Sequence, residues 1–349
     1  MKAITTRQLA LLEKLCNACA VSGDEGEVRR IVLEEVRPLA DEVKVDAMGN
    51  VLSFKKGKGR KKRPRVMLDA HMDEVGFMLV ADDGEGVYQF VTIGGIDPRV
   101  LLGKPVLVGK DHTPGVIGGK PIHLITDADE VLRKPSIDSL RIDLGPGGKA
   151  HPGDWATFAT KFKRSGPSIF AKAIDDRIGV ATLIELFRNA PPDIDILAAF
   201  SVQEELGLRG ATVAAHDFNP DMAIAVDSTP AYDMPRHDGE EILKYNTLLG
   251  QGPAIYVHNA TTLDDPRLVR FLRETAEAEK IPYQIRQPGG GGTNAGAIQR
   301  SLAGVPVVSV SVPGRYAHTP MGLCRMEDWK NTLTLLHAAL NRIGPDTLK

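Results

Sequence analysis

Histidines and acidic residues in this chain recur shortly after apolar runs. In an open α/β sheet, the carboxyl ends of parallel strands meet at one edge, and ligands bind in the crevice outside that edge. Side chains that follow separate strands are therefore expected to converge. Apolar runs at 65–70, 168–174, 194–202, 222–226 and 305–311 lead to His71, Asp175, Glu204 and Glu205, Asp227, and His318. The pattern predicts one metal site built from five loops.

Length and charge limit the class of protein. A chain of 349 residues can bury a substantial core in two domains. Its formal net charge is −2, whereas a general nucleic-acid binder would be more basic. No apolar stretch reaches the roughly 18 residues that a membrane span needs, and residues 1–6 lead into an amphipathic pattern rather than a signal peptide. We therefore expect no nucleic-acid or membrane partner.

The three cysteines are too few for a disulfide framework, which favours a reducing, cytoplasmic compartment. Cys16 and Cys19 form a CxxC pair inside a helix predicted over residues 9–21. We interpret them as core or half-buried thiols rather than as a metal or redox pair. His112, His123 and His151 fall in the middle of the chain and are interpreted as structural or surface residues.

The texture of the sequence changes twice. Helical spacing covers residues 6–21 and 27–37, and paired strands are expected near 43–46 and 50–54. Residues 55–65 hold eight Lys or Arg and predict a solvated hairpin loop. From Gly76 to 166, short β-like runs alternate with glycine and proline turns, which predicts a small all-β barrel or sandwich. Strand–helix alternation then returns, so we expect an α/β domain of residues 1–75 and 167–349 with a β-rich insert, 76–166.

The donor set indicates two metal ions rather than one. Two imidazoles and three carboxylates exceed the three protein ligands and one water of a catalytic zinc. They suit a pair of cations if one carboxylate bridges, and such a pair can activate water and polarise a carbonyl. The side chains of Glu204 and Glu205 diverge as neighbours on a strand end. One can therefore bind metal while the other carries a proton. Asp73 is placed to orient His71.

Several motifs together resemble the M42 aminopeptidases, which belong to the co-catalytic dinuclear zinc exopeptidases. The motifs lie at 70–76, 172–179, 202–207, 225–227 and 315–320. The resemblance implies a three-layer αβα catalytic domain with a PDZ-like β insertion used for subunit contacts. It also implies a cytoplasmic metalloaminopeptidase that removes N-terminal residues from short peptides. Members often form dimers that build a twelve-subunit shell, so a homo-oligomer is expected.

The resemblance implies a role for each matching residue. The metal would be Zn²⁺, with Co²⁺ or Mn²⁺ as alternatives, and two ions would bind per subunit. A metal-bound hydroxide would attack the peptide. Asp175 would bridge the two ions, His71 and Asp227 would complete the site of one ion, and Glu205 and His318 would complete the other. Glu204 would be the general base, and Asp73 would support His71. A cis peptide bond is implied between Asp175 and Asp176.

The chain departs from the family pattern in its glycine-rich segment, residues 289–296. Asn294 stands where the family commonly has Asp, which suggests altered substrate specificity, and Thr319 stands where Ser is usual. Three alternatives remain open. They are a related deacylase or carboxypeptidase, an endoglucanase using paired carboxylates, and an inactive scaffold that keeps the fold.

Overall fold

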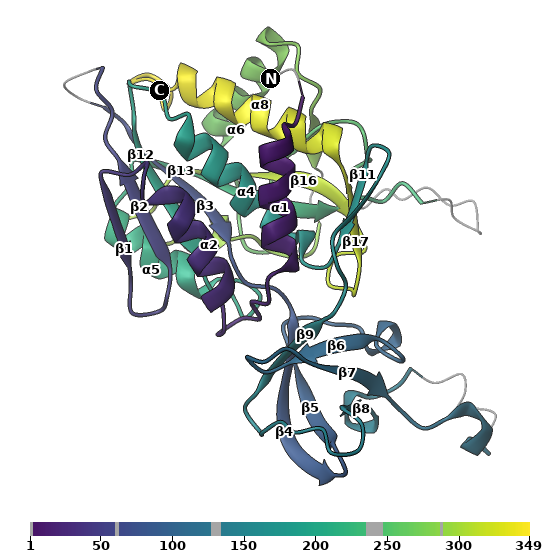
Figure 1. The fold of residues 1–349 in the computed structure, drawn as a ribbon. Coiled ribbons are helices and arrows are strands. Elements are labelled where there is room, and N and C mark those ends of the chain that lie inside the picture. Colours follow the sequence, from purple (N-terminus) through teal and green to yellow (C-terminus); the bar gives the residue numbers. More distant parts are fainter. Residues whose placement is uncertain (1–2, 60–62, 127–133, 235–246, 287–288) are drawn as a thin grey trace.

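The computed structural model of the protein describes residues 3–59, 63–126, 134–234, 247–286 and 289–349. A large sheet carries helices on both faces, and a smaller barrel lies beside them (Figure 1). The α-helices are α1 (Thr6–Asn17), α2 (Gly26–Val36), α4 (Ile174–Arg188), α5 (Arg209–Phe218), α6 (Pro266–Ala278), α7 (Ala295–Gln299) and α8 (Met326–Arg342). Short 3₁₀ helices are η1 (Pro98–Val100), η2 (Ile122–Leu124) and η3 (Ile137–Ser139).

The large sheet has 11 strands in the described residues, with β1-β2-β12-β3-β13-β16-β17-β11-β10 as its main path. These strands are β1 (Glu42–Val45), β2 (Val51–Lys55), β3 (Arg65–His71), β10 (Lys163–Ser165), β11 (Ser168–Ala171), β12 (Asp195–Ser201), β13 (Met222–Pro230), β16 (Val307–Arg315) and β17 (Gly322–Arg325). Off this path, β14 (Ala254–Tyr256) pairs with β16 and with β15 (Gln284–Arg286).

The direction of the strands explains why polar residues gather. Strands β12, β3, β13 and β16 pair in parallel, so their carboxyl ends share one edge. Strand β11 pairs antiparallel with β17, which pairs antiparallel with β16, and β11 therefore runs in the same direction as β16. The five predicted strand ends consequently lie at one edge of the sheet.

Two apolar cores separate three layers. One core joins the sheet to α1, α2, α4, α6 and α8, and it includes the buried Trp329, whose Nε1 donates to Thr182 Oγ1 at 2.9 Å. The other core joins the opposite face to α5 and α7. Helix α4 is buried over most of its length because it lies centrally under its neighbours (Figure 1). The predicted αβα arrangement is confirmed.

The β-rich segment forms a closed barrel, which decides between the predicted barrel and sandwich. Its strand order is β4-β5-β8-β7-β6-β9. Phe77 packs edge-on against Phe90 and Phe158, each with ring centroids 5.2 Å apart. The domain limits 76–166 remain a prediction. Strand β10 lies inside these limits, but it pairs with β11 in the large sheet. The barrel strands are β4 (Gly76–Gly84), β5 (Val87–Ile93), β6 (Pro105–Val108), β7 (Thr113–Gly118), β8 (Arg141–Asp143) and β9 (Trp155–Phe158).

The first helix ends earlier than predicted. Helix α1 stops at Asn17 rather than near Val21, and Ala18 is extended. The Cys19 amide donates to Glu27 Oε2 at 2.9 Å, and the Ala20 amide donates to Glu74 Oε1 at 3.0 Å. These carboxylates, 8 and 54 residues away in sequence, accept from amides that a longer helix would pair with its own carbonyls. Cys19 is therefore outside the helix.

The prediction of a hairpin loop for the basic segment 55–65 is wrong. Strands β2 and β3 both pair with β12, on opposite sides, so the segment crosses the end of β12. Arg63 Nε donates to Asp195 Oδ1 at 2.6 Å at the start of that strand. Residues 60–62 lie outside the described residues.

The thiols and helices agree with the expectations from composition. All three cysteines are free, and Cys324 is buried. Cys16 is buried and Cys19 is partly exposed, which confirms the interpretation of these two as core or half-buried thiols. In the part of the chain that the structure describes, every helix is too short or too polar to cross a membrane.

Candidate metal centre

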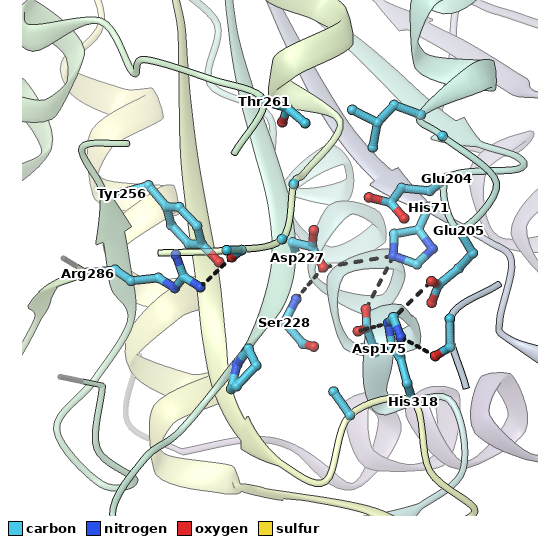
Figure 2. Close-up of a pocket in the computed structure, with 18 of the residues that line it drawn as sticks. His71, Asp175, Glu204, Glu205, Asp227, Ser228, Tyr256, Thr261, Arg286 and His318 are labelled. Atoms are coloured by element: carbon cyan, nitrogen blue, oxygen red, sulfur yellow. Dashed lines mark hydrogen bonds and ion pairs between the residues drawn. The ribbon is translucent and has the colours of Figure 1, made fainter. Parts of the chain in front are cut away.

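The candidate ligands from five segments face one another in a single pocket (Figure 2). His71 is the last residue of β3, and Asp227 lies within β13 rather than after it. Asp175 follows β11 at the start of α4, and Glu205 and His318 lie in the loops after β12 and β16. The structure thus brings every predicted ligand together.

Asp175 occupies the middle of this group. Its Oδ1 lies 3.3 Å from His71 Nε2, and its Oδ2 lies 3.5 Å from His318 Nε2. His71 Nε2 is 3.8 Å from Asp227 Oδ1, and His318 Nε2 is 3.2 Å from Glu205 Oε2. One carboxylate therefore faces both halves of the donor set.

The charges in the pocket favour bound cations. Burial raises the pKa of Glu204 and of Asp227 well above their usual range, and neighbouring carboxylates add to the effect. Burial also acts on Asp175, but hydrogen bonds from His318 and His71 outweigh it and hold the pKa of Asp175 low. For His318, burial opposes protonation, yet hydrogen bonds to Asp175 and Glu205 raise its pKa to about 11. Carboxylates and imidazoles are crowded together in this buried pocket, and the donor set fits divalent ions.

Backbone groups orient both imidazoles. His71 Nδ1 lies 3.1 Å from the carbonyl of Asp73 and 3.5 Å from its Oδ1. The Asp73 carboxylate accepts from the amides of Glu204 (3.0 Å) and Glu205 (3.2 Å), so it also fixes the turn that carries them. His318 Nδ1 lies 2.8 Å from the carbonyl of Gly95, which belongs to the barrel segment. In each case the outer ring nitrogen is held while Nε2 points into the pocket.

Unusual backbone conformations cluster around these ligands. Gln203, His318 and Ala173 have positive φ angles of 55°, 57° and 51°. Such conformations are costly for residues other than glycine and gather at functional sites. The peptide bond between Asp175 and Asp176 is cis, which confirms the expectation from the family resemblance.

Sequence reasoning missed two contributors to this site. Asp176 is fully buried, and one of its carboxylate oxygens lies within 4.8 Å of donor atoms of His71 and Asp227. Its position beside Asp175 was the available signal, but we had given it no role. Gly95 was interpreted only as a turn residue.

A buried ion network fixes the loops on either side of the site. Glu74 accepts from Lys172 Nζ at 2.7 Å and from Arg177 Nη2 at 3.1 Å, and all three side chains are almost fully buried. Arg177 also donates to the carbonyl of Met72 at 2.6 Å. Because Lys172 and Arg177 flank Asp175, the network holds the β3 loop and the bridging residue in fixed register.

The pocket extends from the ligands into a cavity of about 560 Å³, a size typical of small-ligand sites. Its far wall includes Tyr256, Thr261 and Arg286 (Figure 2), together with Gly290–Gly292. Asn294 does not line this cavity. It is buried, and its Nδ2 donates to Asp69 Oδ1 at 2.6 Å. The suggested effect of Asn294 on specificity thus finds no direct contact with this space.

A mixed sheet flanked by helices, whose strand ends present imidazoles and carboxylates to one pocket, is an arrangement able to hold metal ions. The model of a family described as M42 glutamyl aminopeptidase matches residues 49–335. The chain therefore belongs to the M42 family. M42 aminopeptidases are metal-dependent peptide hydrolases, and acidic and histidine groups able to hold metal are present here.

Individual relatives agree over nearly the full length. A putative aminopeptidase of Acetivibrio thermocellus is 34% identical, covering 95% of this chain and 97% of the relative. The lysyl aminopeptidase of Pyrococcus furiosus is also 34% identical, covering 96% and 97%. A solved TET aminopeptidase from a marine sediment archaeon, Thaumarchaeota archaeon SCGC AB-539-E09, is 32% identical with a TM-score of 0.92, covering 98% of each chain. The Pyrococcus horikoshii TET1 peptidase, described as assembling into a tetrahedron or octahedral shell, is 31% identical with a TM-score of 0.82, covering 96% and 100%.

Proposed function

We propose that this aminopeptidase removes N-terminal residues from short peptides at a centre for two divalent cations. The observation that carries the proposal is the position of Asp175, whose two carboxylate oxygens each face a different imidazole at 3.3 and 3.5 Å. A carboxylate in this position suits a bridge between two ions, and it leaves one histidine for each.

The remaining ligands divide into two sets. His71 and Asp227 would complete one site, and Glu205 and His318 would complete the other. Zn²⁺ suits these nitrogen and oxygen donors, and Co²⁺ or Mn²⁺ are alternatives because such sites are only loosely selective. When bound, the two cations would activate a water molecule and polarise the carbonyl of the scissile peptide bond.

Glu204 is the proposed general base. Glu204 lines the pocket beside His71 and Glu205, close enough to share an ion with them, but the two ligand sets proposed above do not include it. It would take the proton from the attacking water and deliver it to the leaving nitrogen. Asp73 would support this step from outside the pocket, because it fixes the amides of Glu204 and Glu205.

The experiment compares two adjacent substitutions. Glu204→Gln should retain metal at wild-type stoichiometry while kcat on aminoacyl nitroanilides falls by about 10²–10⁴-fold. Glu205→Gln should instead lose metal along with activity, which makes it the matched control. Near-full activity in the Glu204→Gln enzyme would refute the assigned base. N-acetylated peptides and carboxymethylcellulose should remain uncut by the wild type, which tests the alternatives of a deacylase or carboxypeptidase and of an endoglucanase.

We also propose self-association through the barrel. The TET1 relative assembles into closed shells, and several apolar barrel side chains here are solvent-exposed. They are Val80, Val91, Leu102, Val116, Ile122 and Leu124. Light scattering of the purified chain should give the mass of a dimer or dodecamer, and Ile122→Lys should lower it. A monomeric wild type would contradict this proposal.

A further inference from the structure

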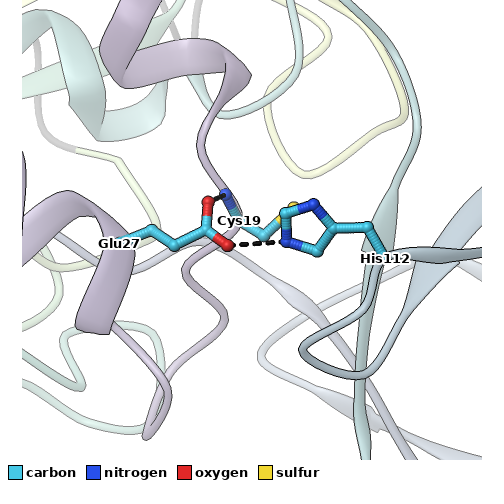
Figure 3. Close-up of side chains that lie close together, drawn as sticks. All are labelled: Cys19, Glu27 and His112. Carbon is cyan, nitrogen blue, oxygen red and sulfur yellow. Dashed lines mark hydrogen bonds and ion pairs between the residues drawn. The ribbon is translucent and has the colours of Figure 1, made fainter.

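A second group of metal-ligating side chains lies away from the catalytic pocket, where the barrel meets the helical layers (Figure 3). Cys19 follows α1, Glu27 lies in the first turn of α2, and His112 lies in the turn between β6 and β7. One ligand atom of each lies within 4.8 Å of the others. The group therefore joins two parts of the fold that are far apart in sequence.

Hydrogen bonds fix the carboxylate between its two partners. Glu27 Oε1 lies 2.6 Å from His112 Nε2, and Glu27 Oε2 accepts from the Cys19 amide at 2.9 Å (Figure 3). His112 has a φ of 53°, in the left-handed region, which histidine adopts more often than most residues other than glycine. The barrel turn thus directs the imidazole at Glu27.

The three donors match a borderline-soft cation. Zinc binds thiolate sulfur at about 2.3 Å and imidazole nitrogen or carboxylate oxygen at about 2.0–2.2 Å, with tetrahedral geometry. Tetrahedral ligands at those lengths stand roughly 3.3–3.7 Å apart. From their separation of 2.6 Å, Glu27 Oε1 and His112 Nε2 would need to open by about 1 Å, and the thiol, which lies within 4.8 Å of a ligand atom of each, would need to approach by at most about 1 Å. Rotations of partly exposed side chains can supply both changes.

The site is also accessible. The side chains of Glu27 and His112 are 28% and 38% exposed. All three residues line a cavity of about 410 Å³ that extends past Asp24 and Trp155. A fourth position on the cation can therefore be filled by water from this cavity.

We propose that Cys19, Glu27 and His112 bind a third divalent cation of the zinc or cobalt type, which joins the barrel to the catalytic layers. Burial raises the pKa of the Cys19 thiol to about 11. The cation must displace that proton, and its affinity should increase with pH. The proposal does not depend on the two-metal mechanism, because none of these residues belongs to the catalytic pocket.

A cation bound to Cys19 would affect the proposed catalytic centre through the segment that connects Cys19 to Ser22. Ser22 follows Cys19 closely, and its Oγ donates to Asp73 Oδ2 at 2.5 Å. Asp73 in turn fixes the amides of Glu204 and Glu205. A cation on Cys19 would therefore hold the segment that supports the proposed general base.

Cobalt titration of the full-length protein tests this site separately from the catalytic one. The protein is stripped with chelator under reducing conditions and titrated with Co²⁺. A thiolate ligand produces an intense near-ultraviolet sulfur-to-cobalt charge-transfer band, which nitrogen and oxygen ligands do not produce. We expect the band to appear with one equivalent of Co²⁺ beyond those taken by the catalytic centre. Added Zn²⁺ should bleach it.

Variants identify the ligands. Cys19→Ser should abolish the band and one equivalent of metal, and His112→Gln should weaken this site by roughly 10–100-fold or more. Cys324→Ala is the matched control and should keep both signals. A wild type without the band, or a band that survives Cys19→Ser, overturns the proposal. Loss of the catalytic equivalents with the band retained would instead refute the proposed two-metal function alone.

Discussion

A buried carboxylic acid next to the proposed metal centre gives a testable prediction about stability. Asp69 lies in β3 with no solvent exposure. Its Oδ1 accepts from Asn294 Nδ2 at 2.6 Å and from Ser201 Oγ at 3.2 Å. Its Oδ2 and Asn294 Oδ1 are buried without partners in the described structure. Burial outweighs these hydrogen bonds and raises the pKa of Asp69 to about 7.

The raised pKa fixes the sign of the pH dependence. An unfolded Asp titrates near pH 3.9, so between about pH 4 and 7 the folded chain binds a proton that the unfolded chain has lost. The free energy of unfolding therefore falls as pH rises through this window. A shift of about 3 units corresponds to roughly 4 kcal/mol once the pH exceeds 7, as an upper bound.

Asp69→Asn should remove this loss. The amide is neutral at every pH and can return a hydrogen bond to Asn294 Oδ1. We expect the variant to be more stable than the wild type by up to about 4 kcal/mol at pH 8, and the difference to shrink towards pH 4. Urea unfolding of the metal-free wild type and variant, at one fixed protein concentration and at pH 5 and pH 8, measures the difference in the free energy of unfolding at each pH. A variant that is less stable at pH 8, with an unchanged pH slope, would show that Asp69 is ionised in the fold and would refute the reasoning.

Two further substitutions test the supports of the site. Glu74→Gln should destabilise the fold by about 3–5 kcal/mol in urea unfolding, because Lys172 and Arg177 would be left buried without their counter-charge; a loss below about 1 kcal/mol would contradict this. Ser22→Ala should lower kcat several-fold with little change in KM, because it removes the 2.5 Å hydrogen bond to Asp73. Unchanged steady-state kinetics would show that Asp73 needs no support from this segment.

The convergence of the ligands could be predicted from sequence because it follows from strand direction. His71 and His318 come near the ends of β3 and β16, which run the same way in one sheet. Asp176 could not be assigned, because neighbouring acids look alike in sequence and the local backbone decides where each points. Gly95 could not be found either. It acts through its carbonyl, which every residue has, and its contact with His318 spans 223 positions.

The two errors in secondary structure have the same origin. Helix α1 ends at Asn17 because Glu27 and Glu74 accept from the amides that follow it. Strands β2 and β3 are separated because β12, more than 120 residues later in the chain, inserts between them. The spacing of apolar residues within each segment does not reveal these carboxylates or the inserted strand. The motifs that resemble the M42 family nevertheless marked residues that the structure brings together in one pocket, because each motif lies at or near the carboxyl end of a strand.

The junction between barrel and sheet carries one more consequence. Gly76 opens β4 only five positions after His71, and the barrel returns the carbonyl of Gly95 to His318. The barrel is therefore attached beside one histidine ligand and holds the other. A Cβ at Gly76 would lie 2.5 Å from Val21 Cγ2 and 2.7 Å from the carbonyl oxygen of Ala156, so Gly76→Ala must shift the barrel or the Val21 segment.

We expect Gly76→Ala to cost about 1–3 kcal/mol of stability, as overpacking commonly does, and to weaken metal binding at the His318 half of the centre. Gly118→Ala is the matched control, because Gly118 lies in barrel strand β7 and a Cβ there meets no atom within 4 Å. Metal content after dialysis against graded chelator, together with kcat/KM, distinguishes the two variants. Equal metal retention in both variants would mean that the position of the barrel does not affect metal binding. The contact from Gly95 to His318 would then not be needed to hold His318 in place.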